Sequence, residues 1–151
     1  MKKSSILNKE LNEVIASMGH TDYLIVCDAG FPIPSDVRRV DLALTRDVPD
    51  LQTVLSTIAE DFIAEKIYIA EDVLNNNAPL FNSIKEIYNG VEIEAHPHSE
   101  ILTTFAKKAK AIVRTGSFEP WGNIVLQSGV DVPKWFDKVG VIVPDYYKDK
   151  M

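Results

Sequence analysis

The feature that most constrains this chain is the alternation of short apolar runs with longer segments of helical periodicity. The run at residues 23–27, YLIVC, is apolar and rich in β-formers, and it predicts a buried strand. A helix is predicted before it, from an N-cap at Asn8 to a terminating glycine at Gly19. The apolar side of this helix has the expected spacing: Leu11, Val14, Ile15 and Met18.

The same alternation continues through most of the chain. We expect further strands at residues 39–44, 66–70, 91–95, 111–114 and 124–127. We expect helices that open at Pro49, at Pro79 and near Ser99, and that end near residues 62, 87 and 108. Strands and helices alternating at this spacing predict an α/β fold, a single layered domain over residues 1–151 with a largely parallel sheet flanked by helices.

The segment from residue 132 to residue 151 differs in character from the rest. It carries four aromatic side chains among charges and prolines: Trp135, Phe136, Tyr146 and Tyr147. Large aromatic side chains are costly to leave in water. We therefore expect this segment to pack on the body of the domain or on a neighbouring subunit.

Composition and charge argue against several classes of partner. The 151 residues are 46% hydrophobic and 25% charged, which is ordinary for a folded globular domain. With 16 basic and 22 acidic residues, a formal charge of -6 and no basic stripe, we expect no nucleic-acid partner. No segment has the length of a signal-peptide core or a membrane span, so we expect a cytoplasmic protein with no membrane partner.

The three histidines are the side chains best suited to proton transfer near neutral pH. His20 lies in the turn after the first helix, and Asp28 follows the strand at residues 23–27. Ligand sites in open α/β sheets gather at the carboxyl ends of strands, which favours Asp28 as a lining residue. Taken alone, a histidine in the position of His20 is more often a surface or capping residue than a catalyst.

Metal and thiol chemistry have weaker support. His96 and His98 form an H-x-H pair that invites a zinc interpretation, but Pro97 kinks the segment and no third ligand stands at a recognised spacing. Cys27 is the single cysteine and lies within the apolar run, where a buried thiol is a simpler interpretation than a nucleophile. The glycine motifs of nucleotide sites and the G-x-S-x-G motif of hydrolases are missing. We expect neither a metal nor a nucleotide cofactor.

Several motifs, in order along the chain, resemble those of the D-ribose pyranase and L-fucose mutarotase family, with a better fit to the pyranase branch. They are MGHTD at residues 18–22, VCDAGFPIP at 26–34, VDLAL at 40–44, AIVRTG at 111–116 and PWGNIVL at 120–126. Together with the N-terminal residues they extend to about residue 130. The resemblance therefore implies a family core at residues 1–130 and a C-terminal extension at residues 132–151.

The resemblance also implies a set of site residues. The catalytic histidine of the family corresponds to His20 in the G-H-T-D motif. His98 is preferred to His96 as the second histidine because it opens the penultimate helix. The implied sugar-binding residues are Asp28, His98, Trp121, Gly122 and Asn123. The family further implies a free monosaccharide as ligand, no metal or cofactor, and a ring-shaped homo-oligomer, a decamer, whose sites are completed at subunit contacts.

The chemistry implied by the resemblance suits these residue types. Converting the pyranose form of free D-ribose into the furanose form moves only protons and one C–O bond, so it needs neither redox nor phosphate chemistry. A histidine can both donate and accept those protons. Asp28 and Asn123 can hold sugar hydroxyls, and Trp121 can stack on the apolar face of the sugar.

Two residues depart from the family pattern. Trp121 stands where pyranases usually carry tyrosine, and Ser117 replaces the glutamate that usually follows the R-T-G motif. These changes leave the preferred sugar open. The alternatives are a mutarotase that acts on another free sugar, such as L-fucose, and a non-catalytic sugar-binding oligomer.

Overall fold

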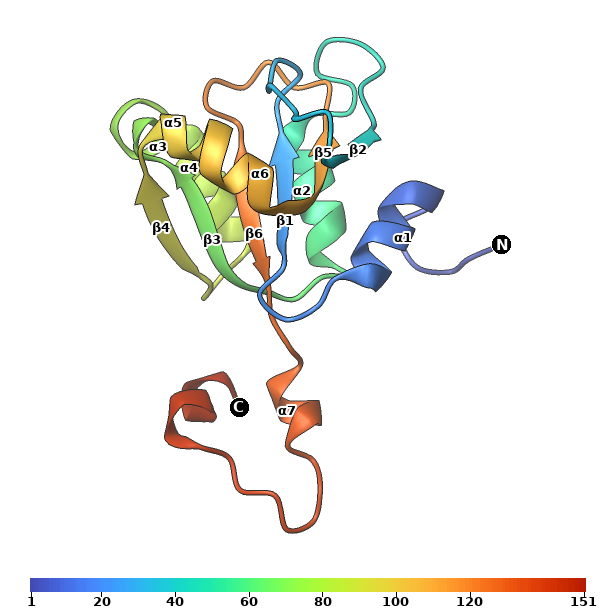
Figure 1. Ribbon diagram of the computed structural model, residues 1–151, viewed down its shortest axis with the longest axis vertical. Helices are drawn as coiled ribbons and strands as arrows, with labels where there is room; N and C mark the ends of the chain where they lie inside the picture. The colour runs from blue at the N-terminus through green and yellow to red at the C-terminus, as the bar shows by residue number, and fades with distance from the viewer.

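One six-stranded sheet in the order β2-β5-β1-β6-β3-β4 organises the computed structural model, which describes residues 1–151 (Figure 1). The strands are β1 Tyr23–Cys27, β2 Arg38–Asp41, β3 Ala64–Ala70, β4 Glu92–His96, β5 Ala109–Arg114 and β6 Ile124–Ser128. β5 is parallel to β1 and β2, and β4 is parallel to β3. Only β6 is antiparallel to its neighbours, β1 and β3. The expected α/β fold with a largely parallel sheet is confirmed.

Helices cover both faces of this sheet. They are α1 Lys9–Ser17, α2 Leu51–Ala59, α3 Glu71–Asn76, α4 Ala78–Ile87, α5 His98–Glu100, the π-helix η1 Ile101–Phe105, α6 Ala106–Lys108, α7 Val132–Trp135 and the 3-10 helix η2 Asp145–Lys150. In Figure 1 the segment from α5 to α6 lies in front of the sheet, and α2 and α4 lie behind it. No helix is long and apolar enough to cross a bilayer.

The core is centred on β1 and its two neighbours. Ile25 in β1 stands opposite Ile112 in β5 and Val125 in β6, and none of these three side chains is exposed to solvent. A strand covered on both faces needs apolar residues in succession, which is the reason that the run at residues 23–27 does not alternate with polar residues.

Three of the expected elements end earlier than predicted, and one of them is α2, which ends at Ala59 instead of near residue 62. β2 stops at Asp41 instead of residue 44, because its partner Arg114 is the last residue of β5. The chain then turns, and the Leu44 N–H donates to the Val48 carbonyl. α1 has the predicted cap at Asn8 but ends at Ser17.

Capping explains both the end of α1 and the start of α2. Gly19 is not the capping residue of α1, because its N–H donates to the Asp22 carboxylate in the turn that follows. α2 begins at Leu51 with Asp50 as its N-cap, so Pro49 lies before the helix and not in its first turn.

Other segments differ in internal structure. The helix expected from Ser99 begins one residue earlier, at His98, and contains a π-helical turn between α5 and α6. The short helix α3 follows β3 directly and was not anticipated, because six residues carry too little periodicity to be recognised. The helices α7 and η2 of the extension were missed for the same reason.

The C-terminal extension leaves β6 and lies away from most of the sheet (Figure 1). Val132 is buried, but Trp135 and Tyr146 remain largely exposed. Phe136 and Tyr146 pack on Tyr147, with ring centroids 5.6 and 4.8 Å away. Of the two expected arrangements, packing on the body of the same chain is met only in small part, and packing on a neighbouring subunit stays a prediction.

We expect Gly116→Ala to destabilise the fold by about 1–3 kcal/mol, a cost typical of forced overpacking. A Cβ at this position would lie 2.3 Å from the Thr45 carbonyl oxygen and 2.6 Å from that of Val48, and backbone atoms cannot move aside cheaply. Thermal unfolding followed by circular dichroism measures the effect. Gly30→Ala is the matched control, because its Cβ would meet only the Asp28 carboxylate at 3.5 Å. Equal stability of both variants would contradict the prediction.

Candidate active site

The carboxylate of Asp28 lies at the carboxyl end of β1, where the backbone leaves the sheet. Its Oδ1 accepts the Gly30 N–H at 2.8 Å, and the Asp28 N–H donates to the Asn123 side-chain oxygen at 3.2 Å. Burial raises the pKa of the Asp28 carboxyl above its usual value, although the Gly30 N–H, the Asn123 amide and the positive charge of His98 each work against that rise. Asp28, Asn123 and His98 are thus brought together from three separate segments.

His98 has an unsatisfied polar atom in this group. Its Nε2 is buried and has no hydrogen-bond partner in the chain. His98 is the first residue of α5, directly after β4 and Pro97, so the end of the strand carries it toward the same edge of the sheet. A buried imidazole nitrogen without a partner is costly unless a ligand completes it.

His96 has a different environment. Its Nδ1 contacts the Glu100 carboxylate at 2.9 Å and its Nε2 contacts the Glu94 carboxylate at 2.7 Å. Burial works against the charged ring, but these two carboxylates together raise the pKa of His96. Both of its nitrogens are occupied within the chain, and its ring packs edge-on against Tyr68 and Phe105. The contacts of His96 are those of a structural residue.

The loop before β6 carries the remaining residues implied by the family resemblance. Trp121 adopts a left-handed backbone conformation with φ 56° and packs against the hydrophobic core. Gly122 has no room for a side chain, since a Cβ would lie 2.9 Å from the Glu119 carbonyl oxygen. Asn123 is buried, which fixes the amide that meets Asp28.

Two residues outside the predicted site hold this loop. The Asn77 amide donates to the Glu119 carboxylate at 2.8 Å and to the Pro120 carbonyl at 3.1 Å. Gln52 on α2 donates to the other Glu119 oxygen at 3.3 Å. These contacts tie the loop to α2 and to the start of α4. No local sequence signal marks them, because the partners are 42 and 67 positions apart.

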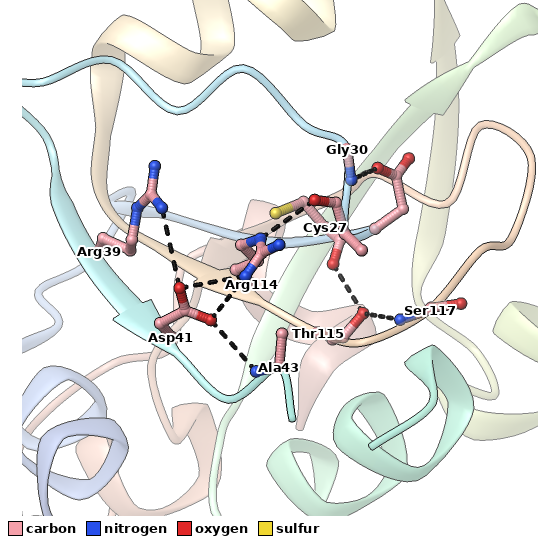
Figure 2. Close-up of polar contacts among 10 residues, drawn as sticks. Cys27, Gly30, Arg39, Asp41, Ala43, Arg114, Thr115 and Ser117 are labelled. Carbon is pink, nitrogen blue, oxygen red and sulfur yellow. Dashed lines mark hydrogen bonds and ion pairs between the residues drawn. The ribbon is translucent and has the colours of Figure 1, made fainter. Parts of the chain in front are cut away.

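A cavity of about 430 Å³ opens beside Asp28. Its walls are formed by seven residues: Asp28, Ala29, Gly30, Arg114, Ser117, Phe118 and Glu119. Arg114 is held by the Ala29 carbonyl at 3.0 Å and by both oxygens of Asp41 at 3.1 and 3.2 Å (Figure 2). Sequence reasoning missed Arg114 as a lining residue, although its place at the end of β5, next to Asp28 at the end of β1, marks the same edge of the sheet.

Ser117, one of the two residues that depart from the family pattern, lies in the wall of this cavity. Ser117 is buried, its N–H donates to the Thr115 hydroxyl, and that hydroxyl donates to the Cys27 carbonyl (Figure 2). Its own hydroxyl accepts the Glu119 N–H at 3.1 Å. The serine therefore shapes the backbone of the wall. Cys27 itself is buried, and burial raises the pKa of its thiol far above the usual range, which argues against a nucleophilic role.

His20 lies at the other end of β1. Its Nε2 is 2.9 Å from the Glu65 carboxylate on β3, and its side chain is 35% exposed. The turn residues Thr21 and Asp22 and the five residues of β1 separate it from Asp28, and β1 alone spans roughly 16 Å at 3.3 Å per residue. The structure therefore does not bring His20 together with the other site residues within one chain.

Metal ligation has no structural support in this chain. No group of three or more histidine, cysteine, aspartate or glutamate side chains could hold a metal ion. The polar groups at the cavity are hydrogen-bond donors and acceptors that include the carboxylates of Asp28 and Glu119 and the guanidinium of Arg114. The fold and the site define a class: an α/β protein with a polar cavity at the carboxyl ends of parallel strands.

Within that class the chain belongs to the RbsD / FucU transport protein family, whose model matches residues 1–131. It is 58% identical to "D-ribose pyranase 2" of Rubrobacter xylanophilus over 99% of this chain and 97% of the relative. It is 52% identical to "D-ribose pyranase 1" of Streptomyces griseus over the full length of both. The D-ribose pyranase of Geobacillus kaustophilus is 42% identical, with 95% of its length matched to 86% of this chain.

Solved structures agree with this placement. Bacillus subtilis RbsD complexed with D-ribose superposes with a TM-score of 0.81 at 37% identity, over 86% of this chain and 98% of that one. A fucose mutarotase from Streptococcus pneumoniae, in complex with L-fucose, has a TM-score of 0.71 at 20% identity, over 86% of this chain and 99% of that one. At that identity the second likeness concerns the fold alone.

We expect His98→Gln to raise the pKa of the Asp28 carboxyl further, because the variant removes a positive charge that lowers it. Side-chain carboxyl NMR titration of the ligand-free protein measures this pKa. His96→Gln is the control, since its charge is directed to Glu94 and Glu100. An equal shift in both variants, or no shift in the first, would show that His98 does not act on Asp28.

Proposed function

We propose that this chain interconverts the pyranose and furanose forms of free D-ribose, in a site assembled from two copies of the chain. The observation that carries the proposal is the joined set of Asp28, Asn123 and the unpartnered His98 beside the cavity. Two relatives named D-ribose pyranase match the chain over nearly its whole length, and the 37% identical structure contains D-ribose. These likenesses support ribose as the sugar.

The reaction requires two proton transfers in each of its two steps, ring opening and ring closure. The anomeric hydroxyl loses its proton as the bond from C1 to the ring oxygen breaks, and the ring oxygen gains a proton. The open form carries a carbonyl at C1. A different hydroxyl then adds to C1, gives up its proton and closes the other ring, while the carbonyl oxygen is protonated. Protons balance over the cycle, so one imidazole that accepts and then donates is sufficient.

The residues predicted to bind the sugar have complementary parts in this proposal. The Asp28 carboxylate accepts hydrogen bonds from sugar hydroxyls, and its charge makes these bonds stronger than neutral ones. The buried His98 Nε2 gains the partner that the chain does not supply. Trp121 offers an aromatic surface, and Gly122 and Asn123 keep the loop close to Asp28. These residues bind and orient the sugar; they are not assigned the proton transfer.

His20 of a second copy supplies the acid-base group. A single sugar is much shorter than the roughly 16 Å that separates the two ends of β1, so it cannot touch His20 and Asp28 of one chain. A closed ring of subunits, each presenting His20 to the cavity of a neighbour, completes every site. The proposed assembly is therefore a ring-shaped homo-oligomer, with the decamer as the proposed size.

We expect His20→Ala to slow ring interconversion about 100-fold or more, the usual contribution of general acid-base catalysis. The fold should persist, because the His20 side chain is part-exposed and lies outside the core. NMR magnetisation transfer between the anomeric protons of D-ribose measures the rate. His96→Gln is the matched histidine control and should keep the activity of the parent.

Three results would each overturn one part of the proposed function: the catalytic histidine, the sugar or the catalysis itself. Parent-like activity of His20→Ala would remove the histidine from the mechanism. Exchange on L-fucose but not on D-ribose would favour the mutarotase alternative. Exchange on neither sugar, with binding retained, would favour a non-catalytic sugar-binding oligomer.

We expect His20→Ala and Asp28→Ala chains to restore activity to each other when they are co-expressed and purified together through two different affinity tags. Each variant alone has no complete site, but random mixing pairs an intact His20 with an intact pocket in about a quarter of the interfaces. The same exchange measurement gives the recovered rate. Activity of the mixture no greater than the mean of the two variants would exclude a site shared between copies.

A further inference from the structure

We propose that Glu65 is a positioning residue for His20, which fixes its proton on Nε2 and leaves Nδ1 as the nitrogen that exchanges protons with the sugar. The proposal deepens the proposed function and rests on His20 as its acid-base group. Glu65 is the second residue of β3, and its Oε2 lies 2.9 Å from His20 Nε2. Its side chain is only 14% exposed, so this carboxylate has little access to water as an alternative partner.

The other oxygen of Glu65 is also held. The Gln127 amide N–H on β6 donates to Glu65 Oε1 at 2.8 Å. The Tyr68 hydroxyl on β3 donates to the Gln127 side-chain oxygen at 2.6 Å. The tyrosine thereby turns the Gln127 nitrogen toward Glu65. Three side chains on two adjacent strands form a chain of hydrogen bonds that ends at His20.

This series of hydrogen bonds determines which nitrogen of the His20 ring is left without a hydrogen. A carboxylate only accepts hydrogen bonds, so His20 Nε2 must carry the hydrogen in its contact with Glu65. In the neutral ring the lone pair is then on Nδ1, which has no hydrogen-bond partner in the chain and lies on a half-exposed side chain. A carboxylate that holds the tautomer of a catalytic imidazole is a recurrent device in acid-base enzymes.

Other charges near His20 are few. From the extension, Lys150 Nζ is 3.6 Å from Glu65 Oε2, and the uncharged Trp135 ring lies edge-on to His20 at 6.4 Å between centroids. Asp22, two residues after His20, is engaged by Lys110 and by the Gly19 N–H. Glu65 is therefore the one carboxylate in direct contact with His20.

Glu65→Gln is the most informative variant because it keeps the size of the side chain. The Gln127 N–H still requires an acceptor, so the new carbonyl oxygen takes the place of Oε1 and the new NH2 group faces His20. An NH2 group donates, which forces His20 Nε2 to accept and moves the ring proton to Nδ1. In the variant the lone pair is then on Nε2, which faces residue 65, and Nδ1 can no longer accept a proton from the sugar.

The test combines spectroscopy with kinetics. Imidazole ¹⁵N NMR of the ligand-free parent should show the proton on Nε2 of His20, and Glu65→Gln should show it on Nδ1. The variant should lose about tenfold in kcat on D-ribose with KM unchanged, because Glu65 does not line the cavity. Glu60→Gln, an exposed carboxylate after α2, is the control and should change none of these readouts.

The outcomes separate this proposal from the proposed function. A parent protein with the His20 proton on Nδ1 would overturn the role of Glu65, even if Glu65→Gln failed to fold. An unchanged tautomer in Glu65→Gln would do the same while His20→Ala remained inactive. Parent-like activity of His20→Ala would instead overturn the proposed function, whatever the tautomer.

Discussion

The pairing of β1 with β5 on one side and β6 on the other is the constraint on which the rest of the structure depends. These three strands are buried in the middle of the sheet, and their apolar residues leave only the ends of the strands for polar chemistry. β1 therefore has a polar residue near each of its ends. Asp28 directly follows its last residue and His20 stands three residues before its first, so one rigid element keeps the two apart.

The antiparallel direction of β6 has a direct consequence for the pocket. Because β6 runs against β1, its first residues lie beside the last residues of β1, with Ile124 opposite Val26. The preceding residue, Asn123, thereby reaches the backbone of Asp28, although 95 positions separate them in the chain. The other end of β6 brings Gln127 to Glu65. One strand thus supports both the Asp28 site and the pair of His20 and Glu65.

The extension sets this chain apart from part of its family. The family model ends at residue 131, and the relative from Geobacillus kaustophilus matches over 130 residues that make up 95% of its length. The relatives from Rubrobacter xylanophilus and Streptomyces griseus match nearly the whole chain, including this segment. Within one chain the extension places Trp135 and Lys150 beside the pair of His20 and Glu65, while most of its aromatic surface stays exposed.

The sequence by itself determined the class of fold and the segments that carry the site. Periodicity identified the apolar strand at residues 23–27 without error, because local pattern and burial agree there. It failed at Pro49 and Gly19, where capping contacts of Asp50 and Asp22 decided the boundaries. The family resemblance supplied His20, Asp28 and the loop before β6, which no local pattern could have joined.

Only the tertiary structure decided how those residues meet. It separated the two histidines near β4, since His96 is occupied by two carboxylates whereas His98 keeps a buried nitrogen free. It also revealed Glu65 as the partner of His20, 45 positions away. Contacts of this kind depend on which strands become neighbours in the sheet. Strand order is set by the packing of the whole chain, so no pattern within a single segment encodes it.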